Sequence, residues 1–211
     1  MAHAVEIVPC LQDNYAYVVV CEATRAAIVI DPSEHEPVLT ALQRLGVAPV
    51  AVLATHHHPD HVGGIEGLVA QFPALRVVCH THDKGRVPCV TETVDDGGSV
   101  TLGALTFTAR HVPGHTLGAV AWSVDDAVFT GDTMFLGGCG RLFEGTPAMM
   151  HRSLCEVIAA ADGATRVYCG HEYTVSNLLF AKHLEPDNRE VLAALDRARA
   201  LRAAGLPTVP G

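Results

Sequence analysis

The residues best able to do chemistry form one dense group, His56 to His61, which directly follows an apolar stretch. Its pattern is His-x-His-x-Asp-His. In a chain of this length with 13 His, the expected number of chance occurrences of this pattern is only roughly 0.003. A functional reason is therefore the better explanation. Alternate residues of an extended segment point the same way, so His56 and His58 can share one cation. Asp60 and His61 follow on the other side of the loop and can hold a second cation. Neutral imidazoles with a carboxylate suit Zn²⁺, and also Fe or Mn.

Four ligands cannot complete two metal sites, so further ligands should stand at the ends of other strands. Three candidates occupy such positions, and each has a neighbouring glycine that permits a tight turn and a close approach of the backbone: His115, Asp132 and His171. Each of them alone would be read as an ordinary loop residue. Together with the first motif, they are predicted to complete the metal-binding set.

Other polar residues near these motifs are predicted to have supporting or structural roles. His57 lies between two paired ligands and must point away from them, toward the surface or a supporting position. For His111 we keep two interpretations open, a supporting residue or a plain strand end. Cys139 and Cys169 are expected to be small buried thiols. The glycine-rich stretch 137–141 lacks the Gly-Lys-Ser/Thr of a phosphate-binding loop, and we expect it to let backbone amides approach a substrate.

The elements that must position these residues can be read from hydrophobic periodicity. Short apolar segments predict strands at 5–9, 15–21, 26–31, 50–55, 76–79, 100–102, 105–111, 120–124, 127–130 and 166–169. Helical periodicity predicts helices at 37–45, 64–72, 174–184 and 189–204, and a further helix that begins at Thr146-Pro147. Antiparallel strands followed by helix–strand units favour two sheets sandwiched between helices. Residues 207–211 resemble a linker.

Composition excludes several classes of protein. The chain has 211 residues, 49% hydrophobic residues and a formal net charge of −9, which argue against a disordered chain and against a partner with a nucleic-acid backbone. No apolar run approaches the ~18 residues of a membrane helix. Residues 1–20 lack the basic start of a secretory signal. The 7 Cys contain no C-x-x-C pair, as expected for reduced thiols. We therefore expect a cytoplasmic protein with no membrane partner, and a monomer.

The ordered set of metal-ligand candidates resembles that of the metallo-β-lactamase superfamily. The flanks at 138–145 and 169–174 resemble, more narrowly, the glyoxalase II family of hydroxyacylglutathione hydrolases. This resemblance implies an α/β fold, a four-layer αββα sandwich over residues 1–172, followed by a shortened C-terminal helical region at 173–211. The helical domain of that family continues beyond position 211 and supplies basic residues that hold glutathione. The resemblance therefore supports the chemistry more firmly than it supports the affinity for glutathione.

The resemblance also assigns roles to individual residues. One divalent cation would be held by His56, His58 and His115. The other would be held by Asp60, His61 and His171, and Asp132 would bridge the two. The substrate would lie along two segments whose residues are Arg141, Leu142, Phe143, His171, Glu172 and Tyr173. Phe143 stands where some members have a Tyr, so a hydroxyl contact to the peptide is expected to be absent.

The implied reaction is hydrolysis of a glutathione thioester, S-(2-hydroxyacyl)glutathione, to glutathione and a 2-hydroxy acid. Two cations, Zn²⁺ in the first place, would provide a hydroxide at neutral pH because a bound cation lowers the pKa of water from 15.7 to about 7. Asp60 and Asp132 are the candidate catalytic carboxylates. Three alternatives stay open: a persulfide dioxygenase with one iron, an exported β-lactamase, and a truncated or engineered protein of this fold that binds metal with weak or altered activity on thioesters, esters or lactams.

Overall fold

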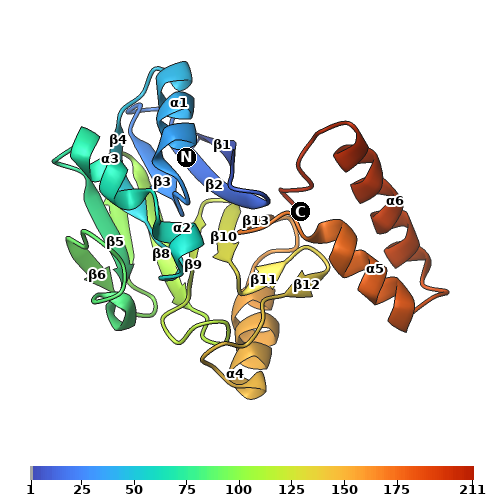
Figure 1. Ribbon diagram of the computed structural model, residues 1–211. Coiled ribbons are helices and arrows are strands. Elements are labelled where there is room, and N and C mark those ends of the chain that lie inside the picture. The colour runs from blue at the N-terminus through green and yellow to red at the C-terminus, as the bar shows by residue number, and fades with distance from the viewer. Residues whose placement is uncertain (1) are drawn as a thin grey trace.

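Two β-sheets packed face to face form the centre of the structure, a computed structural model that describes residues 2–211 (Figure 1). The six-stranded sheet has the order β1-β2-β3-β4-β5-β6. Its strands are β1 (His3–Cys10), β2 (Asn14–Cys21), β3 (Ala27–Ile30), β4 (Pro49–Leu53), β5 (Arg76–His80) and β6 (Glu92–Val94). The pairs among β1, β2 and β3 are antiparallel, whereas β3 to β6 run parallel. The loops after the parallel strands therefore open at one edge of the sheet.

The second sheet has five strands in the order β13-β10-β9-β8-β7. They are β13 (Arg166–Cys169), β10 (Ala127–Gly131), β9 (Val120–Val124), β8 (Leu105–His111) and β7 (Ser99–Leu102). The strands β7 to β10 are antiparallel, and β13 joins β10 in parallel. A small separate hairpin pairs β11 (Met134–Phe135) with β12 (Gly138–Cys139). Sequence reasoning found the strands of both large sheets except β6, and it missed this hairpin.

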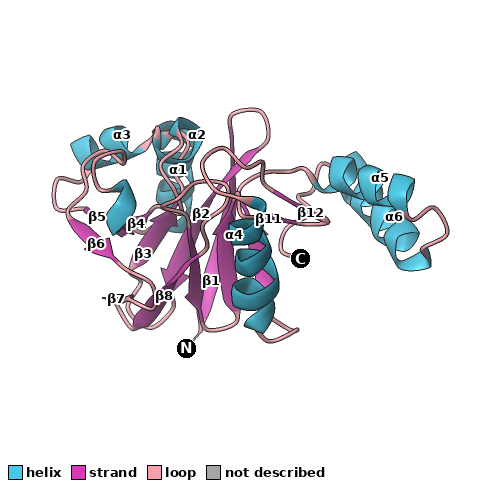
Figure 2. Ribbon diagram, turned by 90° about the horizontal axis from the view of Figure 1, so that it is seen from below, coloured by secondary structure: helices cyan, strands magenta, loops and turns pink. Residues whose placement is uncertain are grey.

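Helices cover both outer faces, which confirms the expected αββα sandwich (Figure 2). The six-stranded sheet packs against α1 (His35–Leu45) and α3 (Ile65–Gln71). The five-stranded sheet packs against the turns that continue α4 (Pro147–Arg152), a π-helix at Ser153–Val157 and a 3₁₀-helix at Ile158–Ala160. Thr146 caps α4 as predicted, because its hydroxyl accepts a hydrogen bond from the backbone N–H of Met149. No helix among residues 2–211 is long and apolar enough to cross a membrane.

The core explains why β2 has no alternation of apolar and polar residues after Asn14. All eight residues of β2 are buried, because one face meets the other sheet and the opposite face meets the helices. Tyr17 and Val19 belong to the core between the sheets, whereas Val18 and Val20 belong to the core beneath α1. A strand buried on both faces gives a continuous apolar run rather than an alternating one.

The C-terminal part forms a helical hairpin beside the sandwich (Figures 1 and 2). Helices α5 (Thr174–Leu184) and α6 (Arg189–Ala203) meet through a small cluster of Leu178, Leu195 and Ala198. The expectation of a linker after this hairpin is wrong. Val209 is buried in the core between the sheets, and Gly211 exchanges two backbone hydrogen bonds of 3.0 Å with Val167 of β13. The last residue of this segment forms its backbone hydrogen bonds with the edge strand β13. Such a tertiary contact is not encoded in the local sequence.

Candidate metal centre

The His-rich motif follows the end of β4, which pairs in parallel with β3 and β5. The chain is extended at His58, with φ −62° and ψ 143°, and then turns into the short helix α2 (Pro59–Val62). Proline suits the first position of a helix because its φ is already helical and its missing N–H would have no partner there. After this turn, the ligand atoms of Asp60 and His61 lie within 4.8 Å of one another and of His171.

Three imidazoles converge to form the first triad. Nδ1 of His58 lies 3.1 Å from Nε2 of His56 and 3.0 Å from Nε2 of His115. The other ring nitrogens of His56 and His115 have partners of their own. Nδ1 of His56 contacts the hydroxyl of Thr55 at 3.1 Å, and Nδ1 of His115 donates to the carbonyl of Arg141 at 2.7 Å. Ligands of a tetrahedral Zn²⁺ at about 2.0–2.1 Å are roughly 3.3 Å apart. The three converging nitrogens therefore have the spacing of a metal site.

A carboxylate and two imidazoles form the second triad. Oδ2 of Asp60 lies 3.4 Å from Nε2 of His171 and 3.8 Å from Nε2 of His61. Each imidazole is oriented from behind by a carboxylate: Nδ1 of His61 contacts Asp31 at 2.9 Å, and Nδ1 of His171 contacts Asp13 at 2.9 Å. Such outer carboxylates fix the tautomer that leaves Nε2 free to bind a cation.

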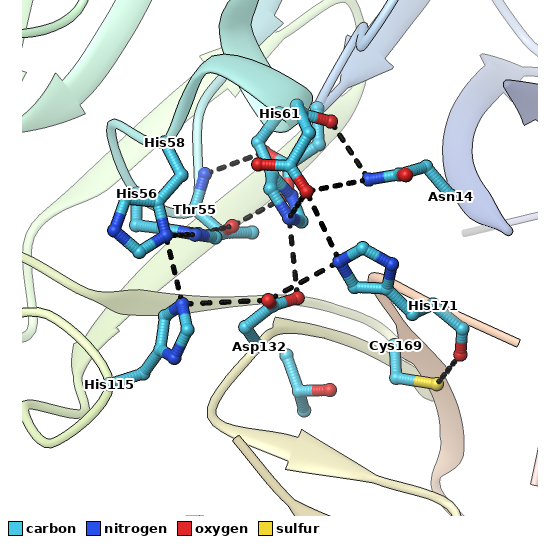
Figure 3. A network of polar contacts seen from close by, with 12 residues as sticks. Asn14, Thr55, His56, His58, His61, His115, Asp132, Cys169 and His171 are labelled. Carbon is cyan, nitrogen blue, oxygen red and sulfur yellow. Dashed lines mark hydrogen bonds and ion pairs between the residues drawn. The ribbon is translucent and has the colours of Figure 1, made fainter. Parts of the chain in front are cut away.

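Asp132 lies between the two triads (Figure 3). Its Oδ1 is 3.3 Å from Nε2 of His61, and its Oδ2 is 3.5 Å from Nε2 of His115 and 3.3 Å from Nε2 of His171. Among residues 2–211, Oδ1 of Asp132 and Nε2 of His61 are buried without a hydrogen-bond partner. Buried polar atoms are rarely left unpaired, and an ion is one of the few explanations. The residues present thus fit a pair of divalent cations.

The electrostatics of the cluster also favour cations. Burial lowers the pKa of His56, His58 and His115, so these imidazoles are neutral and able to coordinate. Burial also disfavours a charged His171, but Asp132 and Asp60 outweigh it and raise its pKa to about 10. Burial likewise opposes ionisation of Asp132, but His61 and His171 outweigh it and hold the pKa of that carboxyl well below its usual range. The second triad thus attracts positive charge.

Comparison with known proteins identifies the chain. Residues 11–171 match the metallo-beta-lactamase superfamily, and residues 172–211 match the hydroxyacylglutathione hydrolase C-terminus. The chain is 46% identical over 95% of its length to a hydroxyacylglutathione hydrolase of Gloeobacter violaceus, covering 80% of that protein. It belongs to the hydroxyacylglutathione hydrolase family. It is also 45% identical, over 96% of its length and 81% of the relative, to an Arabidopsis thaliana protein named hydroxyacylglutathione hydrolase cytoplasmic.

The fold comparison agrees with the family. A crystal structure of a protein in a di-iron-bound form matches with a TM-score of 0.67 and 30% identity, covering 80% of this chain and 91% of that one. Members of the hydroxyacylglutathione hydrolase family are hydrolases, so this chain is a metal-dependent hydrolase of the metallo-β-lactamase fold.

Several residues that support the centre of this hydrolase were missed by sequence reasoning. Asp31 accepts from the backbone N–H and the hydroxyl of Thr55 as well as contacting His61. Asn14 donates to Oδ2 of Asp60 at 3.1 Å, and Asp13 stands behind His171. Asp31 carried one usable signal, because it is a carboxylate at the end of a predicted strand, and Asp132 stands just after the end of another. Nothing local marks Asp13, in the turn between β1 and β2, or Asn14, the first residue of β2.

The neighbouring histidines support the ligand loops. His57 points away from the triads, as predicted, but it is buried rather than at the surface: its Nδ1 lies 3.1 Å from Asp83. His111 contacts the carbonyl of Leu117 at 2.8 Å and stacks on His80 with a centroid distance of 4.4 Å, so it steadies the loop that carries His115. The prediction for Cys139 is wrong, since that thiol is exposed on β12, whereas Cys169 is buried as predicted.

The predicted substrate residues fall into two groups. Arg141, Leu142 and Phe143 are exposed at the mouth of the site, and the Phe143 ring lies edge-on to His58 and His115 at 5.4 and 5.3 Å. On the opposite side, Tyr173 stacks on the ring of His171 at 4.6 Å. These aromatic rings line both flanks of the centre.

Glu172 corrects the sequence expectation. Its carboxylate is only 8% exposed and accepts hydrogen bonds from Tyr15 and from Thr208, away from the triads. The reason is that side chains alternate along the segment after β13, so His171 and Glu172 point in opposite directions. The side chain of Glu172 is therefore a structural tie rather than a substrate contact.

Glu144 gives a prediction about acid stability. Arg86 donates to its carboxylate at 2.6 Å and the backbone N–H of Leu117 donates at 2.7 Å, which lowers the pKa of Glu144 from 4.5 to about 2. A carboxyl with a depressed folded pKa stabilises the fold above its unfolded pKa, and that stability is lost as the pH falls from about 4.5 toward 2. Glu144→Gln is expected to lower the free energy of unfolding at pH 7 by about 1.5–3 kcal/mol.

Urea unfolding of the metal-free protein at pH 7 and at pH 3 tests this prediction. The difference in free energy of unfolding between wild type and Glu144→Gln should be smaller at pH 3 than at pH 7, because the wild-type carboxylate begins to protonate there. Glu22→Gln, which changes an exposed carboxylate in the turn after β2, serves as the matched control and should change neither curve. An equal difference at both pH values would contradict the assignment.

Proposed function

We propose that this chain hydrolyses the thioester of S-(2-hydroxyacyl)glutathione, such as S-lactoylglutathione, with two divalent cations, Zn²⁺ first and Fe or Mn as alternatives. The observation that carries the proposal is Asp132, whose two oxygens lie within 3.5 Å of nitrogens from both triads. One cation would be held by His56, His58 and His115. The other would be held by Asp60, His61 and His171. The similarity to a structure with two irons supports a pair.

The proposed chemistry divides between the cations and the side chains. Two bound cations would supply a hydroxide nucleophile at neutral pH and polarise the thioester carbonyl. Asp60 makes its contacts with Asn14, His61 and His171 through Oδ2, and its Oδ1 could orient the hydroxide by accepting a hydrogen bond from it. A thiol has a reference pKa of only about 8.5, so the departing sulfur needs no acid from the protein.

The mouth of the site suggests how the substrate lies. The guanidinium of Arg141 stands 5.8 Å from the Phe143 ring centroid and offers a positive charge for a carboxylate of the glutathione moiety. Leu142 and Phe143 provide apolar contact on the same side, and Tyr173 flanks the other. We propose residues 1–172 as the catalytic unit and 173–211 as the helical region that completes its wall.

The direct test is metal content and thioester hydrolysis measured on the same sample. Protein loaded with Zn, Fe or Mn is expected to retain about two equivalents after dialysis and to hydrolyse S-lactoylglutathione. At most one equivalent with every metal would contradict the two-cation proposal. Two equivalents without turnover would favour a metal-binding protein that does not act on this substrate.

Single ligand replacements should separate the two cation sites. His115→Ala is expected to empty the first site because it removes one of three imidazoles there, whereas His171→Ala should weaken mainly the second. Each variant should lose about one equivalent of metal after dialysis, as measured by elemental analysis. Loss of both equivalents from each variant would show that the triads do not act as separate sites.

A further inference from the structure

The buried carboxylate of Glu172 joins four parts of the chain that are distant in sequence. Its Oε2 accepts from the Tyr15 hydroxyl at 2.6 Å and from the backbone N–H of Thr208 at 2.8 Å. Its Oε1 accepts from the Thr208 hydroxyl at 2.7 Å. The guanidinium of Arg202 lies 3.7 Å away. One carboxylate thus connects the β1–β2 hairpin, the segment after β13 that contains Glu172 itself, helix α6 and the segment that follows α6.

The same hairpin holds the second triad from behind. Asp13 contacts Nδ1 of His171, and Asn14 donates to Asp60. Backbone hydrogen bonds also join the hairpin to the segment after β13 that carries His171. The N–H of Tyr15 donates to the carbonyl of Gly170 at 2.9 Å, and the N–H of Glu172 donates to the carbonyl of Asp13 at 2.8 Å. The position of Tyr15 therefore sets the position of the two outer partners of the second triad.

Among residues 2–211, the Glu172 carboxylate makes no hydrogen bond or ion pair with the first triad or with its outer partners. The outer partners of His56 and His115 are Thr55 and the carbonyl of Arg141, which lie in other loops. A disturbance at Glu172 should accordingly pass to one triad and leave the other in place.

We propose that Glu172 is a positioning residue for the second cation, acting through Tyr15 on the hairpin that carries Asp13 and Asn14. This inference rests on the two cation sites proposed above. It gives the residues after α5 a role in the metal centre, because Thr208 and Arg202 hold the carboxylate from the C-terminal side. A carboxylate, and not merely a polar group of the same shape, is required, since three donors and a guanidinium surround its two oxygens.

The test is a stepwise metal titration of the full chain by calorimetry, with Zn²⁺ as the probe. Glu172→Gln places an amide N–H₂ among donors and should weaken the second binding step about tenfold, as loss of an outer partner does, while the first step stays unchanged. Tyr15→Phe removes only the hydroxyl and should have the same selective effect. The double variant should be no weaker than the stronger single variant, because both changes break one connection.

Matched variants separate positioning from general damage. Glu172→Asp should recover part of the second step, and Glu185→Gln, which changes an exposed carboxylate, should leave both steps intact. An unchanged second step in Glu172→Gln, or equal weakening of both steps, would overturn the inference. Because wild-type protein is titrated in parallel, fewer than two binding steps in the wild type would instead contradict the proposed pair of cations.

Discussion

Replacement of Asp132 by alanine is expected to lower kcat/KM for S-lactoylglutathione more than about a hundredfold and to weaken both cations. Loss of a residue that only holds a metal ligand from behind already lowers metal affinity or activity about 10–100-fold. Asp132 contacts the candidate ligands directly, with oxygens 3.3 Å from His61 and from His171 and 3.5 Å from His115. Its negative charge also offsets the repulsion between two divalent cations. Steady-state hydrolysis and metal content of the same preparation measure the two effects.

The control for this variant is Asp187→Ala, which removes an exposed carboxylate between α5 and α6. It should keep wild-type activity and two equivalents of metal. An Asp132→Ala protein that retained both cations after dialysis would show that the carboxylate does not bridge, even if its activity fell.

The second large effect is expected at Asp31, which is buried and holds three donors. Asp31→Ala would leave the backbone N–H and hydroxyl of Thr55 and Nδ1 of His61 without their acceptor. Its φ is +49°, a left-handed conformation that alanine adopts less readily than Asp or Asn. Breaking such a buried arrangement typically costs about 3–5 kcal/mol. Urea unfolding of metal-free protein at pH 7 measures the loss.

Asp31→Asn distinguishes stability from metal binding. The amide oxygen can still accept from Thr55, but the amide N–H₂ now faces Nδ1 of His61 and favours the tautomer with its proton on Nε2. That proton would occupy the atom that should bind the second cation. We expect a smaller loss of stability than in Asp31→Ala, together with loss of about one metal equivalent. Nitrogen NMR of the His61 ring reports the tautomer, and an unchanged Nδ1 proton would contradict the explanation.

The candidate ligand set could be predicted from sequence because four of its members form one motif and the other three lie within a few residues of strand ends. Asp31, Asp13 and Asn14 could not, because their roles depend on which strands are neighbours. Asp31 reaches Thr55 only because β3 pairs with β4, and the Asp13 turn reaches His171 through a bridge between Asn14 and His171. Strand order is a property of the whole chain, so a single segment does not reveal it.

The hairpin β11–β12 and the packing of the segment after α6 could not be predicted for a related reason, the lack of a local signal. Each strand of β11–β12 has two residues, too few for a periodic signal. Residues 207–211 contain two prolines among small and apolar residues, a composition typical of linkers. Their burial arises from the space between the two sheets and from the free edge of β13, which exist only after the sandwich has formed.

The backbone exchange between Gly211 and Val167 has a consequence for colloidal behaviour. An uncovered edge strand offers unpaired N–H and C=O groups to any other chain and promotes edge-to-edge aggregation. Here Gly211 forms hydrogen bonds with both the N–H and the C=O of Val167. The buried Val209 side chain holds the covering segment in the core. Removal of these last residues should therefore increase light scattering at high protein concentration, even under conditions in which the remaining sandwich stays folded.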